Sequence, residues 1–286
     1  MPYTLSYFVF YLVVLSQVLL LSFYLPRTVL RRLRRVIDEH PPSTYPKLYP
    51  MSIEVVERGL RRYRIMNLLI LLAGLALVFA GIYAPSADML NWDNQAVLAL
   101  YACLQFSPML LVERSGLKYY RLMRKANVRT TRRADLQPRR LLDFVSPAFL
   151  GLAILAYGGF VLLVLYVRQH PFPGFAGYTN IVLMTAMNLF LAGIVFKTLH
   201  GKRRDPHQAS EDQRRQIEFV VKTMVLSSIV GTVFLSITLI LPALELRDLT
   251  PLCQNLFFQL LAVISFRALR PDDINFDVYK EEPLVA

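Results

Sequence analysis

Charge is scarce in this sequence of 286 residues. Charged residues make up only 18% of the chain, against about a quarter in typical soluble domains. Hydrophobic residues make up 55%, and the mean hydropathy is +0.42. This balance excludes an ordinary soluble domain and favours a protein embedded in a membrane.

Cysteine is also rare. The chain contains only Cys103 and Cys253, and each lies within an apolar stretch. Two such residues cannot build a disulfide framework or a cysteine-based metal site. We interpret both as small core residues.

Motifs of catalysis are missing as well. The four histidines are scattered along the chain, and no His-Glu-x-x-His, Gly-x-Ser-x-Gly, phosphate loop or dinucleotide fingerprint occurs. No acidic, basic or histidine residue lies in the central part of any long apolar stretch, where membrane enzymes and proton-coupled pumps usually place them. We therefore predict a protein that is not an enzyme, with no catalytic residue, no metal and no cofactor.

Long apolar stretches are what the sequence does contain. Seven of them reach or approach the ~20 residues that a helix needs to cross ~30 Å of hydrocarbon. They predict an all-α integral membrane protein with seven transmembrane helices in a single transmembrane domain. The predicted spans are residues 7–25, 67–83, 96–112, 147–167, 181–199, 223–244 and 251–269.

The basic residues predict the orientation of these spans. If the N-terminus lies outside and each span reverses direction, 30 of the 32 Lys and Arg residues fall on the inside, and only Arg168 and Arg247 fall outside. This split follows the positive-inside rule and would be lost if one span were miscounted. It places the C-terminal tail, residues 270–286, in the cytoplasm. It also divides the net charge of +12 into +14 on the inside and −2 on the outside, so the basic excess belongs to a membrane face, which argues against a nucleic-acid partner.

Two inside segments have the pattern of amphipathic helices. They cover residues 27–39 and 52–65, and the first alternates aliphatic residues with five arginines at helical spacing. Each basic residue near an anionic leaflet can contribute ~1 kcal/mol to binding. Anchoring and orientation are one interpretation, and a specific lipid site is another. The candidate contacts to anionic lipid are Arg31, Arg32, Arg34, Arg35, Arg61, Arg62, Arg139, Arg140, Arg214 and Arg215.

A short motif occurs twice. Residues 139–145 and 214–220 share the pattern Arg-Arg-x-aliphatic-acid-Phe-Val, and a weaker copy at 61–64 keeps the arginine pair. The motif suggests one leading helix followed by three two-helix hairpin repeats. The alternative interpretation is that inner helix ends share arginines only because lipid headgroups attract them.

Neutral polar residues inside the spans form a candidate intramembrane site. Alignment of the third, fifth and seventh spans on their inner ends brings three amides to similar depth. They could line a polar site, or simply form hydrogen bonds between helices. Pro108 should also free a backbone carbonyl in the third span. The candidate residues are Gln105, Ser107, Asn188, Asn255 and Gln259.

Two further pairings follow from position. Glu113 ends the third span at the depth where Lys197 and Arg267 end the fifth and seventh, which predicts an ionic latch at the inner boundary. Gly74 and Gly81, and likewise Gly151 and Gly158, are seven residues apart, so each pair lies on one helix face and predicts close helix packing.

These features predict a non-catalytic, multi-pass protein of a bacterial inner or plasma membrane. It would act as a subunit, sensor or scaffold whose basic cytoplasmic face binds anionic phospholipid headgroups or an acidic partner, either a membrane or a cytoplasmic protein. The alternative is a transporter of a neutral or lipid-like solute, with a polar site between the third, fifth and seventh helices.

Overall fold

The fold is described from a computed structural model of the chain, which describes residues 5–83, 95–127, 139–201, 205–266 and 274–280. These residues form helices, turns and loops, and no strand occurs among them. Seven helices are long and apolar enough to cross a membrane. The prediction of an all-α protein with seven such helices is confirmed.

The long helices are α1 (Leu5–Leu19), α2 (Leu25–Glu39), α3 (Ile53–Tyr83), α4 (Gln95–Ala126), α5 (Pro147–Val167), α6 (Thr179–His200), α7 (Ser210–Ala243) and α8 (Thr250–Phe266). Short turns of helix lie between them: η1 (Leu20–Tyr24), η2 (Pro46–Leu48), η5 (Leu141–Asp143), η6 (Arg247–Leu249) and η8 (Phe276–Tyr279).

The first span and the amphipathic segment after it form one continuous helix. The π turn η1 joins α1 to α2, and Pro26 follows it at the start of α2. Proline has no N–H to donate to the carbonyl of Ser22 four residues earlier, and its ring crowds that carbonyl. A wider π turn at this point lets the helix continue past the proline.

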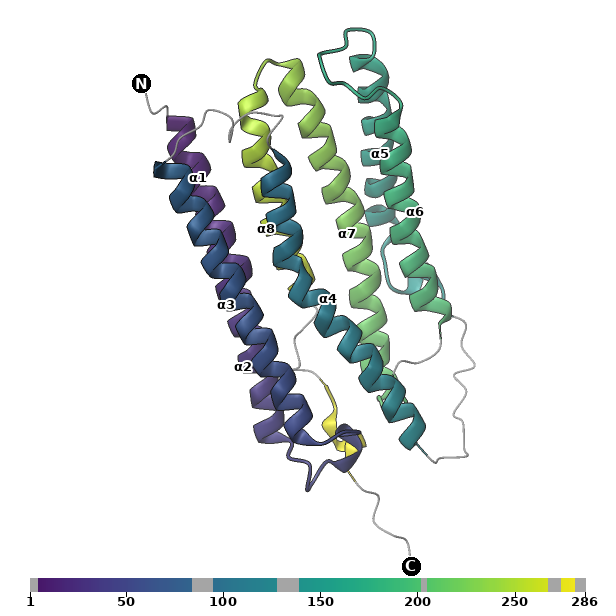
Figure 1. Cartoon of the computed structure of the whole chain (residues 1–286). Helices are drawn as coiled ribbons and strands as arrows, with labels where there is room; N and C mark the ends of the chain where they lie inside the picture. The colour runs from purple at the N-terminus through teal and green to yellow at the C-terminus, as the bar shows by residue number, and fades with distance from the viewer. Residues whose placement is uncertain (1–4, 84–94, 128–138, 202–204, 267–273, 281–286) are drawn as a thin grey trace, which may run out of the picture.

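The second amphipathic segment is likewise the first part of a longer helix, because α3 runs from Ile53 to Tyr83 without interruption. The long helix α7 also begins well before its apolar stretch, at Ser210. Both helices therefore carry polar, charged turns beyond the length that a bilayer core requires. These extensions lie at the end of the bundle that also holds α2, the end of α4 and η8, which we call the arginine-rich end (lower end of Figure 1).

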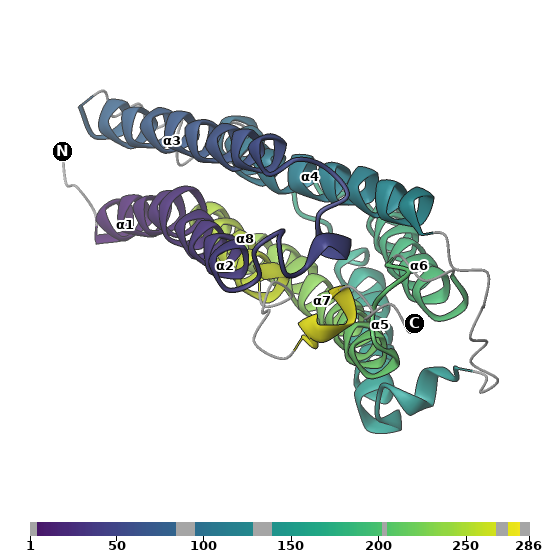
Figure 2. The ribbon, with the colours of Figure 1, turned by 90° about the horizontal axis from the view of Figure 1, so that it is seen from below.

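The helices pack as two groups joined through the middle of the bundle. On one side α1 lies between α3 and α8, and α4 packs on α3; on the other side α7 packs against both α5 and α6. Contact between α7 and α8 joins the groups. Figure 2, seen along the helices, shows α5 and α6 far from α1 and α3.

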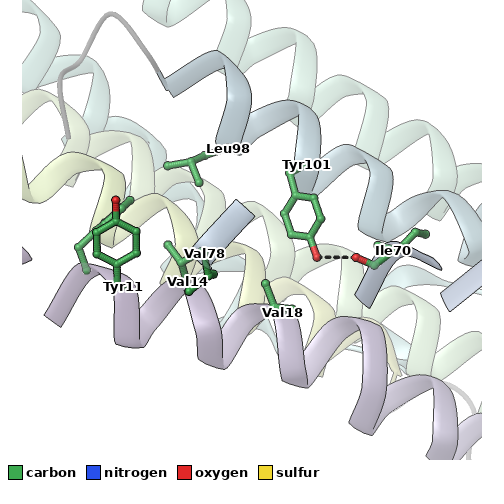
Figure 3. Close-up of a cluster of buried hydrophobic side chains, with 8 residues drawn as sticks. Tyr11, Val14, Val18, Ile70, Val78, Leu98 and Tyr101 are labelled. Atoms are coloured by element: carbon green, nitrogen blue, oxygen red, sulfur yellow. Dashed lines mark hydrogen bonds between the residues drawn. The ribbon is translucent and has the colours of Figure 1, made fainter. Parts of the chain in front are cut away.

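Close packing joins α1, α3 and α4. Buried side chains of these helices form one apolar cluster that includes Val18, Val78 and Leu98 (Figure 3). A methyl group added to Gly74 would collide with the ring of Tyr101 and with Val18, and one added to Gly81 would collide with the ring of Tyr11. The close packing predicted at this pair of glycines is confirmed.

The second glycine pair behaves differently. A methyl group on Gly151 or Gly158 would meet no atom within 4 Å beyond the helix itself. The expected close approach there is wrong, because the face of α5 that carries these glycines does not meet another described helix. Cys103 also differs from expectation, since it is exposed on α4, while Cys253 is partly buried. In a membrane an apolar side chain can face lipid as well as the core.

The two copies of the Arg-Arg motif have different structures. Residues 139–145 form an extended entry and the turn η5, whereas residues 214–220 lie inside α7. Phe144 and Val145 of the first copy pack against Ile217 of the second, in one buried cluster. The motif therefore brings two segments together without giving them the same conformation.

Candidate functional site

Gln105 lies at the centre of a buried hydrogen-bond network. Its Oε1 accepts from Nε2 of Gln17 at 2.8 Å, and its Nε2 donates to Oγ of Ser22 at 3.2 Å. The hydroxyl group of Tyr101, 3.4 Å from the same Nε2, donates to the carbonyl of Ile70 at 3.0 Å (Figure 3). The network joins α1, η1, α3 and α4 at the depth of the predicted spans.

Gln17, like Ser22 and Tyr101, belongs to this network but was not among the candidate residues that the sequence predicted. Its side chain is only 1% exposed, and its Oε1 has no hydrogen-bond partner. A buried carbonyl without a donor costs free energy. Gln17 was one polar residue among several in the spans, and nothing in the spacing showed which way α1 would turn it.

Gln259 lies on the other side of α1. Its Nε2 donates to the carbonyl of Val13 and to Oγ of Ser16, both at 3.1 Å. Ser16 and Gln17 are neighbours, so α1 is the element that brings Gln105 and Gln259 near one another. The amides bond to α1 and not directly to each other.

Asn188 belongs to a separate group. Its Oδ1 accepts from the hydroxyl of Ser228 at 2.7 Å, which joins α6 to α7. Because α6 packs on α5 and α7, the described residues do not bring Asn188 into one site with Gln105 and Gln259.

The last two candidate polar residues bond within their own helices. Asn255 donates to the carbonyl of Pro251 at 2.7 Å. Ser107 donates to the carbonyl of Leu104 at 2.7 Å, which is the carbonyl that Pro108 leaves without its helical partner. These bonds therefore do not connect Asn255 or Ser107 to the other candidate polar residues.

The predicted latch is spread over separate helices. Glu113 on α4 and Lys197 on α6 are both exposed, and the ion pairs recorded among the described residues do not join them. Arg267 lies outside the described residues. Its pairing with Glu113 stays a prediction.

The arginines proposed to contact lipid lie on α2, α3 and α7 and just before η5. All ten have a described side chain, and all but Arg32 and Arg139 are exposed. Arg215 forms an exposed ion pair with Glu211 at 2.7 Å, one helical turn away, which contributes little to stability.

A groove of about 530 Å³ opens between α2 and α3 at this end. Ser22, a member of the Gln105 network, lines it. Arg27, Arg31 and Arg34 line it from α2, and Arg64 lines it from α3. The groove is the place where the basic face and the buried polar network meet.

The C-terminal segment forms a second polar cluster, which the sequence did not predict. The hydroxyl of Tyr279 bonds to Oδ2 of Asp205 at 2.6 Å, and the backbone N–H of Asn275 bonds to Oδ2 of Asp212 at 3.0 Å. Burial, followed by the nearby Asp205 carboxylate, raises the pKa of Tyr279 far above its ordinary value. The phenol is therefore held as a hydrogen-bond donor.

The same segment packs on the loop after α2. The ring of Phe276 lies 3.9 Å from that of His40, and the side chain of Tyr49 donates to the carbonyl of His40 at 2.7 Å. Burial, with a smaller effect from Asp38, raises the pKa of Tyr49. Within the described residues, no group of three His, Cys, Asp or Glu side chains is placed to hold a metal ion.

Comparison with known proteins adds no relative, since no protein-family model, curated protein or solved structure matches the chain.

Proposed function

We propose that this chain is a non-catalytic membrane protein, acting as a subunit, sensor or scaffold, whose arginine-rich end faces the cytoplasm and binds anionic phospholipid. The observation that carries the proposal is the exposure of the arginines on α2, α3 and α7 at one end of a bundle of membrane-length helices. Such a surface lies where anionic headgroups are most concentrated, in the cytoplasmic leaflet. The membrane we propose is a bacterial inner membrane.

The orientation rests on the sequence and the helix ends together. The arginine-rich extensions of α2, α3 and α7 belong to segments that the positive-inside rule assigns to the cytoplasm. Reporter fusions after Asp93 and after Pro173 test this assignment. Both should report an external location, and a cytoplasmic signal from either one contradicts the orientation.

Lipid binding is preferred over transport because of how the amides are paired. Gln105 and Gln259 bond to α1, and Asn188 bonds to α7, so each amide serves contact between helices. Hydrogen bonds of this kind stabilise a bundle without requiring a solute. An acidic protein partner would use the same exposed arginines.

The test compares two lipids on the full-length protein. The purified, delipidated protein is titrated in detergent with phosphatidylglycerol or with phosphatidylcholine of the same acyl chains, and its thermal unfolding is followed. We expect phosphatidylglycerol to raise Tm by about 2–4 °C more than phosphatidylcholine, and the difference to shrink in high salt. Equal responses to the two lipids would contradict the proposal.

A further inference from the structure

Two helix faces meet along the groove between α2 and α3. Phe23, Arg27, Arg31 and Arg34 recur every three or four residues, with Leu30 beside Arg31, and so form one stripe along η1 and α2. Across the groove, Arg64, Asn67, Leu68 and Leu71 form a matching stripe on α3. The groove is therefore made by two regular helix surfaces, and its volume of about 530 Å³ is typical of small-molecule sites.

The charge on its walls is of one sign. Four arginines line the groove, and no carboxylate lines it among the described residues. Like charges one helical turn apart repel each other, so Arg27, Arg31 and Arg34 cost free energy on α2 when no anion is present. Guanidinium groups bind phosphate oxygens through paired N–H donors, which suits this wall to a phosphate ester.

Toward the middle of the bundle the walls become apolar. Phe23 is 47% exposed and Leu68 is 51% exposed, and both face the groove or its rim. Arg64 lies three residues before the start of the predicted second span, and Leu68 and Leu71 lie within that span. The groove is thus basic at the level of the headgroups and apolar at the level of the acyl chains.

Two buried polar residues lie where the basic and apolar walls meet. Ser22 and Asn67 are each 4% exposed and line the groove from opposite sides. Ser22 belongs to the π turn η1, a kind of helix distortion that is frequent at functional sites. Its hydroxyl accepts a hydrogen bond from Gln105, so an occupant of the groove is connected to α4 through one side chain.

We infer that this groove is a discrete site for one anionic phospholipid. The phosphate binds between Arg27, Arg31 and Arg34 of α2 and Arg64 of α3, the glycerol esters lie beside Ser22 and Asn67, and an acyl chain follows Leu68 and Leu71. A phospholipid fits both walls, whereas a free phosphate uses only the arginines and leaves the apolar wall without a function. The inference rests on the proposed lipid-binding function and adds a defined location to it.

The experiment compares charge-matched variants of the full-length protein. The groove variant R27Q/R31Q/R34Q removes three arginines of the site, and the control R58Q/R61Q/R62Q removes three exposed arginines of α3 outside it. Native mass spectrometry measures binding of the first phosphatidylglycerol molecule, with phosphatidylcholine as reference. We expect at least about tenfold weaker binding in the groove variant and less than about threefold in the control.

A second pair keeps all charges. Leu68→Trp fills the apolar part of the groove, and Leu69→Trp places the same ring on a neighbouring exposed position that does not line it. Only Leu68→Trp should weaken the first binding step. This pair decides the question if the triple groove variant does not give a monodisperse protein.

The outcomes separate the site from the general function. Equal losses in the two arginine triples, or unchanged binding in Leu68→Trp, would overturn the discrete site while leaving diffuse lipid binding intact. Failure of the unmodified protein to prefer phosphatidylglycerol over phosphatidylcholine would overturn both proposals. Stronger loss in both groove variants than in their controls supports the site.

Discussion

The hydroxyl group of Tyr279 donates a 2.6 Å hydrogen bond to Oδ2 of Asp205, 74 residues earlier in the chain. Oδ1 of the same carboxylate accepts from the backbone N–H of His207 at 2.8 Å, and both side chains are buried. A phenol bonded to a carboxylate at this length is a charge-assisted hydrogen bond. The pair attaches η8 to the loop that precedes α7, at the arginine-rich end.

Removal of the Tyr279 hydroxyl should release this segment. Tyr279→Phe leaves Asp205 buried with only its backbone donor, which should cost about 1–3 kcal/mol of local stability. Hydrogen exchange of residues 274–280 should become faster while that of α1 and α3 stays unchanged. Asp277→Asn is the control, because it removes only an exposed ion pair to Lys280. Slower hydrogen exchange of the segment in Tyr279→Phe than in this control would contradict the role assigned to the Tyr279 hydroxyl.

The same bond predicts a dependence on alkaline pH. The pKa of Tyr279 is raised in the folded protein, chiefly by burial and then by Asp205, while in the released segment the phenol titrates near pH ~10. Because the pKa of the phenol is higher in the attached segment than in the released one, its contribution to attachment is fully present below the pKa of the released phenol. The contribution falls as the pH rises above that value. Cleavage of the segment by an alkaline protease should therefore accelerate above pH ~10 in the natural protein.

Tyr279→Phe provides the control for that measurement. The variant should be cleaved faster at pH 8 and should lose most of the additional acceleration above pH ~10. A small alkaline response is still expected, because burial also raises the pKa of Tyr49, which packs on the same loop. An unchanged alkaline response would show that the phenol of Tyr279 does not control release.

The helices could be predicted from the sequence because a membrane-spanning helix forms all its backbone hydrogen bonds within itself. Length and hydropathy are therefore enough to recognise each one. The sequence placed α5, from Pro147 to Val167, at the observed bounds, and Ser146 caps that helix by accepting from the N–H of Phe149 at 3.3 Å. Thr250 begins α8 but does not cap it in this way, because its buried hydroxyl has no hydrogen-bond partner among the described residues.

The sites depend on how helices are rotated against one another, which hydropathy does not determine. Gln105 was recognisable as a polar residue in a span, but its partner Gln17 depends on the face that α1 turns toward α4. The groove needs two stripes from different helices to meet. The attachment of Tyr279 to Asp205 joins two polar segments that have no periodic pattern.

Gly74 tests the packing of α3 against α1 and α4. Gly74→Ala forces the ring of Tyr101 to move and breaks its hydrogen bond to Ile70, so we expect a loss of about 1–3 kcal/mol. Thermal unfolding in detergent measures the change. Gly158→Ala is the matched control, since its added methyl group meets nothing within 4 Å and alanine favours a helix. Equal Tm values for the two variants would contradict the close packing at Gly74.

The bond between Gln17 and Gln105 tests whether the buried network stabilises the bundle. Gln105→Leu leaves Nε2 of Gln17 without its partner, and Gln17→Leu leaves Oε1 of Gln105 without its donor. The losses of unfolding free energy in the two single variants should add up to more than the loss in the double variant. The reason is that each single variant leaves one amide group without its partner, whereas the double variant removes both amides. Chemical unfolding in mixed micelles should give a coupling energy of about 0.6–2 kcal/mol. A coupling near zero would mean that water or another group replaces the lost partner, and that the amides act independently.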